Sequence, residues 1–164
     1  MKNRHVPHFA VHKDGKIHGF FGEFSFLSNF YICQNGIGMG SIIFPSVENA
    51  YQAAKWDENQ RFQFVEISPS DAKRLGKISP NLDKKKWNKK KYDIMYELNW
   101  SKYQNNPILK KKLLMTEGCD LAELNNWNDT DWGINERGEG ENNLGKILMR
   151  IRDKIIAMET NNEF

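Results

Sequence analysis

A run of apolar residues at helical spacing after Ser46 constrains the fold of this chain most strongly. Val47, Ala50, Tyr51 and Ala54 stand at i, i+3, i+4 and i+7, which is the spacing of the buried stripe of an amphipathic helix. Ser46 is a typical N-cap, because its hydroxyl can accept a hydrogen bond from a backbone N–H of the first turn. The segment that begins at Val47 is therefore predicted to be a helix with one buried face.

Four later segments carry the signals that begin or end helices. The motif SPSD at 68–71 is a capping box with proline in the first helical position, and Gly76 is expected to end a helix over 69–75. Helices are also expected over 83–105 and, opened by a proline, over 107–115. The last helix is expected to bury one apolar face, made of Leu144, Ile147, Leu148, Ile151 and Ile155.

Short strands are expected mainly near the N-terminus. Residues 9–21 hold Asp14-Gly15 between two strand-forming runs, which is typical of a tight hairpin turn. The aromatic-rich segment 24–31 and the apolar segment 41–44 are expected to be strands or strand-to-loop edges, and 121–124 a further short strand. These elements predict an α+β fold in which a small β-sheet is framed by helices.

The length and composition favour one globular domain. A chain of 164 residues is close to the usual domain size of about 100 to 150 residues, so residues 1–164 are expected to form a single domain. No apolar run approaches the roughly 18 residues that span a bilayer, and residues 1–10 lack the apolar core of a signal peptide. We therefore expect a cytoplasmic protein with no membrane contact and no obligatory protein partner.

Common metal, cofactor and hydrolase motifs are missing from the sequence. All four histidines lie in the first 18 residues, but no Cys, Asp or Glu cluster completes a metal-binding spacing, and neither Cys33 nor Cys119 has a CxxC partner. The phosphate-loop motifs GxGxxG and GxxxxGKS do not occur, and neither do GxSxG and HExxH. No metal and no cofactor are expected.

A polar stripe lies beside the apolar stripe of the helix after Ser46. Glu48, Gln52 and Lys55 recur at i, i+4 and i+7, and Tyr51 and Trp56 flank them. The stripe could be a solvated face with one favourable contact worth a few tenths of a kcal/mol. A carboxylate and an amine beside aromatic walls could also have perturbed pKa values that suit acid or nucleophilic chemistry. The residues alone leave both interpretations open.

Two further segments combine tryptophan with charge. The irregular segment 125–142 begins with NNWNDTDWG, whose tryptophans could stack on a nucleobase, or could cover the core while Asp129 and Asp131 cap loop amides. Six lysines within 84–91 surround Trp87 and could contact phosphates and a base, although such runs are usually solvated. The net charge of +3 permits a phosphate-bearing partner without requiring one.

Taken in order, these segments resemble the NADAR (YbiA-like) family of N-glycosidases. FLSNFY at 26–31 is similar to the family's SNFY opening, FPSVENAYQAAK at 44–55 to its E-x-x-[FY]-Q-A-x-K helix, and DAKRLGK at 71–77 to its A-x-x-L-G segment. NDTDWG at 128–133 and NNLGKILMRIR at 142–152 are similar to its D-x-x-W-G and N-x-L-G-x-x-L-M-x-x-R motifs. The resemblance covers most of the chain, with a motif core at about 20–156, and it implies a YbiA-like fold.

Two positions depart from the family pattern. Asn49 stands where many members have histidine, and Ile134-Asn135 replaces a more glycine-rich continuation after Gly133. Both departures could retune the substrate.

The resemblance implies hydrolysis of the N-glycosidic bond between ribose and a nitrogenous base. The expected substrate is ADP-ribosylated, such as ADP-ribosylated guanine, either free or on nucleic acid. Phosphorylated ribosylaminopyrimidine intermediates of riboflavin biosynthesis are the alternative within the enzyme class. A non-catalytic module that binds ADP-ribose or another nucleotide is the alternative from a different class, and an RNA-binding module is a third.

The resemblance also implies roles for individual residues. Glu48 would be the general acid and base with a raised pKa, and Lys55 would either attack a ring-opened ribose or hold a phosphate. Asp129 would bind ribose hydroxyls or orient a water. Trp87 and Trp132 would stack on the base, in a pocket formed by the Glu48 helix, the Trp87 helix and the Trp132 loop. The other expected substrate contacts are Ser28, Asn29, Phe30, Tyr51, Gln52, Gly133 and Asn142.

Overall fold

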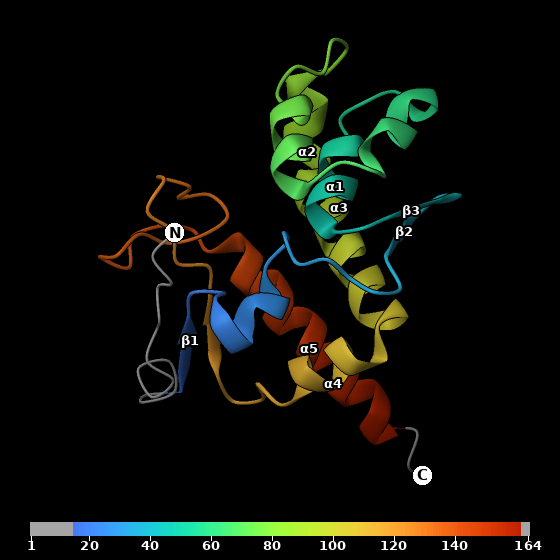
Figure 1. Cartoon of the computed structure of the whole chain (residues 1–164). Coiled ribbons are helices and arrows are strands. Elements are labelled where there is room, and N and C mark those ends of the chain that lie inside the picture. Colours follow the sequence, from blue (N-terminus) through green and yellow to red (C-terminus); the bar gives the residue numbers. More distant parts are fainter. Residues whose placement is uncertain (1–14, 162–164) are drawn as a thin grey trace. The chain divides into compact units, whose positions relative to one another are not determined.

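The computed structural model describes residues 15–161, which form two compact units. The central unit runs from Asn29 to Lys110, and the terminal unit combines the chain up to Ser28 with the chain from Lys111 onward. Helices dominate both units, and the strands pair in two small sheets, so the fold is α+β as predicted (Figure 1).

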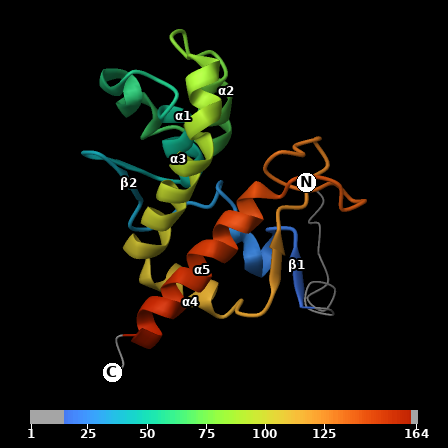
Figure 2. The same ribbon diagram turned by 180° about the vertical axis from the view of Figure 1, so that it is seen from behind.

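The central unit is built around three helices and a hairpin. Its elements are β2 (Ile37–Met39), β3 (Ile42–Phe44), α1 (Val47–Ala53), the 3-10 helix η2 (Glu58–Phe64), α2 (Pro69–Gly76), α3 (Lys84–Asn105) and the first part of α4 (Pro107–Leu114). Strands β2 and β3 are antiparallel, with Ile37 opposite Phe44. Helix α1 packs against both α2 and α3, which lie beside it in the two opposite views (Figures 1 and 2). This packing buries every residue of α1.

The terminal unit pairs two strands from distant parts of the chain. It contains β1 (Lys16–His18), the 3-10 helix η1 (Gly22–Leu27), β4 (Asp120–Ala122) and α5 (Asn143–Asn161). Strands β1 and β4 are parallel, with Ile17 opposite Leu121. Helix α5 lies against β4, and Gly145 permits this close approach because a Cβ there would collide with the carbonyl oxygen of Leu121. The predicted apolar face of α5 is buried.

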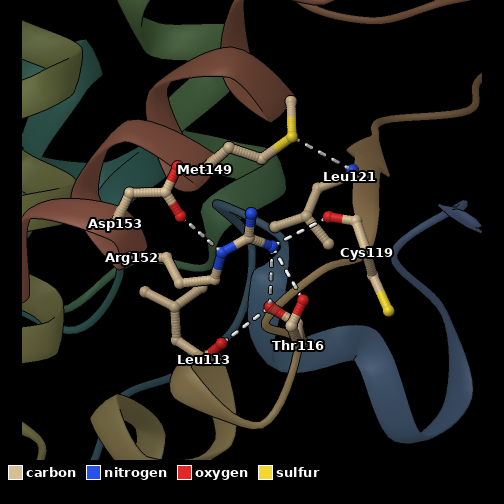
Figure 3. A network of polar contacts seen from close by, with 7 residues as sticks. All are labelled: Leu113, Thr116, Cys119, Leu121, Met149, Arg152 and Asp153. Atoms are coloured by element: carbon tan, nitrogen blue, oxygen red, sulfur yellow. Dashed lines mark hydrogen bonds and ion pairs between the residues drawn. The ribbon is translucent and has the colours of Figure 1, made fainter. Parts of the chain in front are cut away.

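A buried arginine ties α5 to the turn that precedes β4. The Nη1 atom of Arg152 donates to the carbonyl oxygens of Thr116 and Cys119, each at 2.8 Å, and Nε donates to Asp153 Oδ1 at 3.0 Å (Figure 3). Arg152 is only 6% exposed, so these charge-assisted bonds take the place of hydration around its guanidinium. Arg152, the last residue of the NNLGKILMRIR motif, therefore binds backbone carbonyl groups inside the protein.

The predicted helices agree closely with the observed ones. Ser46 caps α1, since its hydroxyl oxygen accepts a hydrogen bond from Asn49 N at 3.1 Å. The cap of α2 at Ser68 and that of α3 at Asp83 are likewise formed by side chains. Helix α2 continues through Gly76, which was expected to end it; this glycine does not adopt a positive φ and Lys77 is the C-cap.

The aromatic segment 24–31 is neither the strand nor the strand-to-loop edge that was expected. It forms η1 over Gly22–Leu27 and then a turn, with backbone bonds from Phe24 N to Phe21 O at 2.9 Å and from Ser28 N to Ser25 O at 3.0 Å. Phe24 and Phe26 are buried, so their aromatic character reports burial and not an extended backbone.

Other expectations have mixed outcomes. Residues 125–142 form a loop as expected, apart from an isolated bridge between Leu124 and Ile134. The first arm of the hairpin expected over 9–21 lies outside the described residues, as do three of the four histidines.

Within residues 15–161 no group of three or more metal-ligating side chains could hold an ion. No helix of this described part is long and apolar enough to cross a membrane.

Candidate functional site

Three polar side chains of α1 and its C-terminal turn form a continuous hydrogen-bonded row. Gln52 Nε2 donates to Glu48 Oε1 at 2.7 Å, and Lys55 Nζ donates to Gln52 Oε1 at 2.8 Å. Glu48 and Gln52 are 6% and 5% exposed, and Lys55 is half-buried. We call these three residues the Glu48–Lys55 row. It is a buried polar stripe and not a solvated helix face.

Aromatic rings line the row. Tyr51 of α1 and Trp87 of α3 are both buried, with ring centroids 5.1 Å apart and planes inclined by 58°. The Lys55 Nζ atom lies 5.2 Å from the centroid of Tyr51 and 5.6 Å from that of Trp87, within cation–π range of both. Trp87 is thus the packed residue within the lysine run, of which the first five lysines are exposed and Lys91 is half-buried. Trp56, which was expected beside the row, packs edge-on against Phe64.

The surroundings of Lys55 disfavour its charged form. Burial lowers the pKa of Lys55 and is the largest cause, while the Glu48 carboxylate opposes it. Positive charges at Lys73, Lys77 and Lys91 lower this pKa further. The row therefore combines a carboxyl group with an amine that loses its proton more easily than an ordinary lysine, which is the pairing that proton transfer and nucleophilic chemistry require.

Asn29 of the SNFY motif contacts the first turn of α1, where the row begins. The Asn29 carbonyl oxygen accepts from Glu48 N at 2.9 Å, at the first turn of α1. Its side chain is buried against α3, where Nδ2 donates to Met95 Sδ at 3.3 Å and Oδ1 accepts from Asn99 Nδ2 at 3.3 Å. Asn29 is therefore engaged inside the central unit. Phe30 is 37% exposed, with Lys73 Nζ 5.6 Å from its ring centroid.

The loop of the terminal unit is organised around Asp129. Its Oδ1 accepts from Trp132 N at 3.0 Å, and its backbone N–H and carbonyl oxygen bond to the side-chain amide of Asn125 at 3.1 and 2.9 Å. The aspartate therefore caps a turn, the structural role that the sequence left open. Asp129 and Trp132 are half-buried, whereas Trp127 is 55% exposed and does not cover the core.

Gly133 and Asn142 hold the same loop against β4. A Cβ at Gly133 would collide with the carbonyl oxygen of Glu123, so only glycine allows this approach. Asn142 has a positive φ of 51°; its Oδ1 accepts from Glu123 N at 3.2 Å and its Nδ2 donates to Leu121 O at 2.9 Å. Ser28, the last residue of this unit before the central one, is half-buried.

Sequence reasoning missed the structural use of Asn49 and of Gly76. Asn49 is fully buried, and its Nδ2 donates to the carbonyl oxygens of Phe64 and Ile67, each at 2.8 Å. It joins α1 to the end of η2 and to the segment before α2, so this departure from the family pattern has a structural role. Gly76 lies directly against Gln52. The A-x-x-L-G motif was the available signal, but its glycine was interpreted as a helix end.

Comparison with known proteins identifies the family. A family model of the NADAR domain matches residues 11–156. The chain is 34% identical over 160 residues to the chloroplastic riboflavin biosynthesis protein PYRR of Zea mays, covering 90% of this chain and 25% of that protein. It is 32% identical to a riboflavin biosynthesis protein of Vibrio vulnificus, covering 79% and 35%. The chain therefore spans about a third or less of these two relatives.

A smaller relative and a solved structure match over most of their lengths. The N-glycosidase YbiA of Escherichia coli is 32% identical over 113 residues, which cover 68% of this chain and 70% of that protein. The NMR structure of E. coli YbiA matches with a TM-score of 0.76 and 29% identity, covering 88% of this chain and 86% of that one. With the domain match, the colinear motifs and this shared fold together, the chain belongs to the NADAR family.

Proposed function

We propose that this protein is an N-glycosidase that hydrolyses the bond between a ribose and a nitrogenous base. The observation that carries the proposal is the Glu48–Lys55 row, which places a buried carboxyl group and an amine with a lowered pKa beside two aromatic rings. The names of the E. coli YbiA and Nostoc punctiforme relatives, both N-glycosidases, support the same reaction class.

Glu48 is the proposed general acid and base. As the bond between C1 of the ribose and the base nitrogen breaks, the base leaves with the bonding electron pair and takes a proton from the Glu48 carboxyl group. The resulting carboxylate accepts a proton from the water whose oxygen bonds to C1. The products are the free base and a ribose with a hydroxyl group at C1.

Lys55 has two proposed roles. In the first, its neutral amine adds to C1 of a ring-opened ribose, the base departs with its electron pair and a proton, and water then hydrolyses the imine. The lowered pKa of Lys55 supports this role, because a larger fraction of the amine is neutral. In the second role, the ammonium holds a phosphate group of the substrate. Borohydride trapping distinguishes the two, since only the imine is reduced to a stable adduct on Lys55.

An ADP-ribosylated base, such as ADP-ribosylated guanine, is our first candidate substrate. The positive field of Lys73, Lys77 and Lys91 around Lys55 supports a diphosphate-bearing ligand. Tyr51 and Trp87 place buried aromatic rings beside the same amine. The predicted contributions of Asp129, Trp132 and the other contacts of the terminal unit to binding stay predictions.

The phosphorylated ribosylaminopyrimidine intermediates of riboflavin biosynthesis are the second candidate. The support comes from two relatives that match over most of this chain and are named for riboflavin biosynthesis. These intermediates also present an N-glycosidic bond, a ribose and a phosphate, so the same row could act on them.

Release of the base from each candidate tests the proposal. Purified protein is incubated separately with ADP-ribosylated guanosine and with the riboflavin-pathway intermediates, and the free base is measured by mass spectrometry. We expect release from one substrate, loss of about 100-fold or more in Glu48→Gln, and no change in Glu58→Gln, an exposed residue of η2. Binding of ADP-ribose without base release would support the non-catalytic module instead and contradict the enzyme.

A further inference from the structure

The two hydrogen bonds of the Gln52 side-chain amide are compatible with only one orientation of its oxygen and nitrogen atoms. Its carbonyl oxygen accepts from the Lys55 ammonium at 2.8 Å, and its NH₂ group donates to the Glu48 carboxylate at 2.7 Å. A cation faces the acceptor end and an anion faces the donor end, so both bonds are charge-assisted. Because Gln52 is buried, water does not readily replace either bond. The substrate contact that the family resemblance implied for Gln52 stays a prediction.

Helix α2 closes the other side of the Gln52 side chain. A Cβ built on Gly76 would collide with Gln52 Oε1 and would lie 2.7 Å from Cδ and 2.9 Å from Cβ of the same residue. Gly76 has no positive φ, so its backbone conformation does not require glycine. Space for the Gln52 amide is the physical reason for a glycine at this position of the helix.

We propose that Gln52 is a positioning residue that holds Glu48 and Lys55 at a fixed separation, and that Gly76 is glycine so that the Gln52 amide can lie between them. Glu48 lies in the first turn of α1 and Lys55 lies seven positions later, in the turn that follows the helix, a separation of about 10 Å at the helical rise per residue. An intervening side chain with both a donor and an acceptor links them across that distance. This inference rests on the proposed function for its effect on turnover, but not for its effect on the Lys55 amine.

The charges around Lys55 define what Gln52 contributes. Glu48 faces it along α1, Lys73 and Lys77 from α2 and its C-cap, and Lys91 from α3. Lys73, Lys77 and Lys91 repel the Lys55 ammonium. The Gln52 carbonyl oxygen accepts a hydrogen bond from that ammonium and so stabilises its charged form against this repulsion. Changing that acceptor is therefore expected to change the pH at which Lys55 loses its proton.

Two substitutions test the proposal through the reactivity of Lys55. In Gln52→Glu a carboxylate of nearly the same shape replaces the amide, so the attraction on the Lys55 ammonium is strengthened while the donor to Glu48 is replaced by a second carboxylate oxygen. In Gly76→Ala the new methyl group displaces the Gln52 amide without changing any polar group. Lys55 modification by limiting acetic anhydride, read by peptide mass spectrometry from about pH 6 to about pH 11, gives its titration midpoint.

We expect opposite shifts in the two variants. The midpoint should rise by about one pH unit or more in Gln52→Glu and fall in Gly76→Ala, where the acceptor is lost. The control Gln104→Glu places the same charge change on an exposed residue of α3 and should leave the midpoint unchanged. Alanine is the better helix former, so Gly76→Ala has no intrinsic reason to lose its helix.

Equal midpoints in Gln52→Glu and Gln104→Glu would overturn the positioning role, and an unchanged midpoint in Gly76→Ala would overturn the role of the glycine. If Gln52→Glu does not fold, the shift in Gly76→Ala decides the proposal alone. A protein that shows both shifts but releases no base from either substrate would refute the proposed function while leaving the positioning of Lys55 by Gln52 in place.

Discussion

Replacing Lys102 by methionine is expected to stabilise this protein at neutral pH. Lys102 lies on α3 and is 0% exposed, with its Nζ atom 5.8 Å from the Tyr31 ring centroid and 5.4 Å from that of Tyr103. Burial lowers the pKa of Lys102 to about 8, opposed by the nearby Cys33. Methionine preserves much of the length of the side chain and removes the charge that burial disfavours.

The size of the effect follows from that pKa. The difference between the ordinary value of 10.5 and about 8 corresponds to roughly 3 kcal/mol, at about 1.4 kcal/mol for each pKa unit. Between these two values the unfolded chain binds more protons at Lys102 than the folded protein, so the contribution of this group to stability rises with pH. Below about pH 8 both states are protonated, and the full penalty of burying the charge applies.

Urea unfolding followed by circular dichroism measures this difference. Below pH 8 we expect the free energy of unfolding of Lys102→Met to exceed that of the wild type by about 3 kcal/mol, apart from a change in packing energy that does not depend on pH. This difference in unfolding free energy should narrow by about 2 kcal/mol between about pH 8 and about pH 9.5. Burial raises the pKa of Cys33, which lowers stability in alkali, and the Lys102 ammonium opposes that rise. Lys102→Met removes this ammonium, so the Cys33 contribution narrows the difference further in alkali.

The test is how the difference in unfolding free energy between Lys102→Met and the wild type changes with pH, and not the stabilisation itself. Lys90→Met is the matched control, because Lys90 is an exposed residue of the same helix whose ammonium is hydrated in the folded and unfolded chain. The difference in unfolding free energy between Lys90→Met and the wild type should stay small and should not change with pH. A gap for Lys102→Met that is constant from about pH 7 to about pH 9.5 would show that the burial of charge on Lys102 does not limit stability.

Two further substitutions test structural roles. Asn49→Ala removes the donor to the buried Phe64 carbonyl group and should cost about 2 to 4 kcal/mol, lowering Tm by several degrees while the turnover of folded protein is kept. Asn59→Ala, an exposed change, should leave Tm unchanged; a normal Tm with altered substrate preference in Asn49→Ala would contradict this role. Arg152→Met removes the bonds drawn in Figure 3 and should cost about 2 to 4 kcal/mol by urea unfolding. Similar losses in Arg152→Met and in the exposed Arg150→Met would refute that assignment.

Local sequence signals predicted the α-helices because their causes are local. The N-caps at Ser46, Ser68 and Asp83 each act within three residues of the helix start, and apolar spacing reports which face is buried. The segment 24–31 was mispredicted for the same reason. Aromatic content is common to strands and to buried turns, and only its packed surroundings distinguish the two.

The candidate site was predicted in part. The spacing of Glu48, Gln52 and Lys55 placed them on one stripe, but spacing alone could not distinguish a solvated face from a buried one. The packing of α2 and α3 against α1 decides that question, because it removes water from the stripe and brings Trp87 to Tyr51. The predicted binding roles of the Asp129 loop stay predictions.

The sequence by itself determined the family, the starts of α1, α2 and α3 and the residues that share the polar stripe, all of which depend on order and spacing along the chain. Only the tertiary structure decided how those residues are used. Gln52 links an acid to an amine, and Gly76 permits this because two helices approach closely there. Asn49 and Arg152 bind backbone carbonyl groups that are distant in sequence. Such partners meet only when burial brings separate segments together and water no longer satisfies their polar groups.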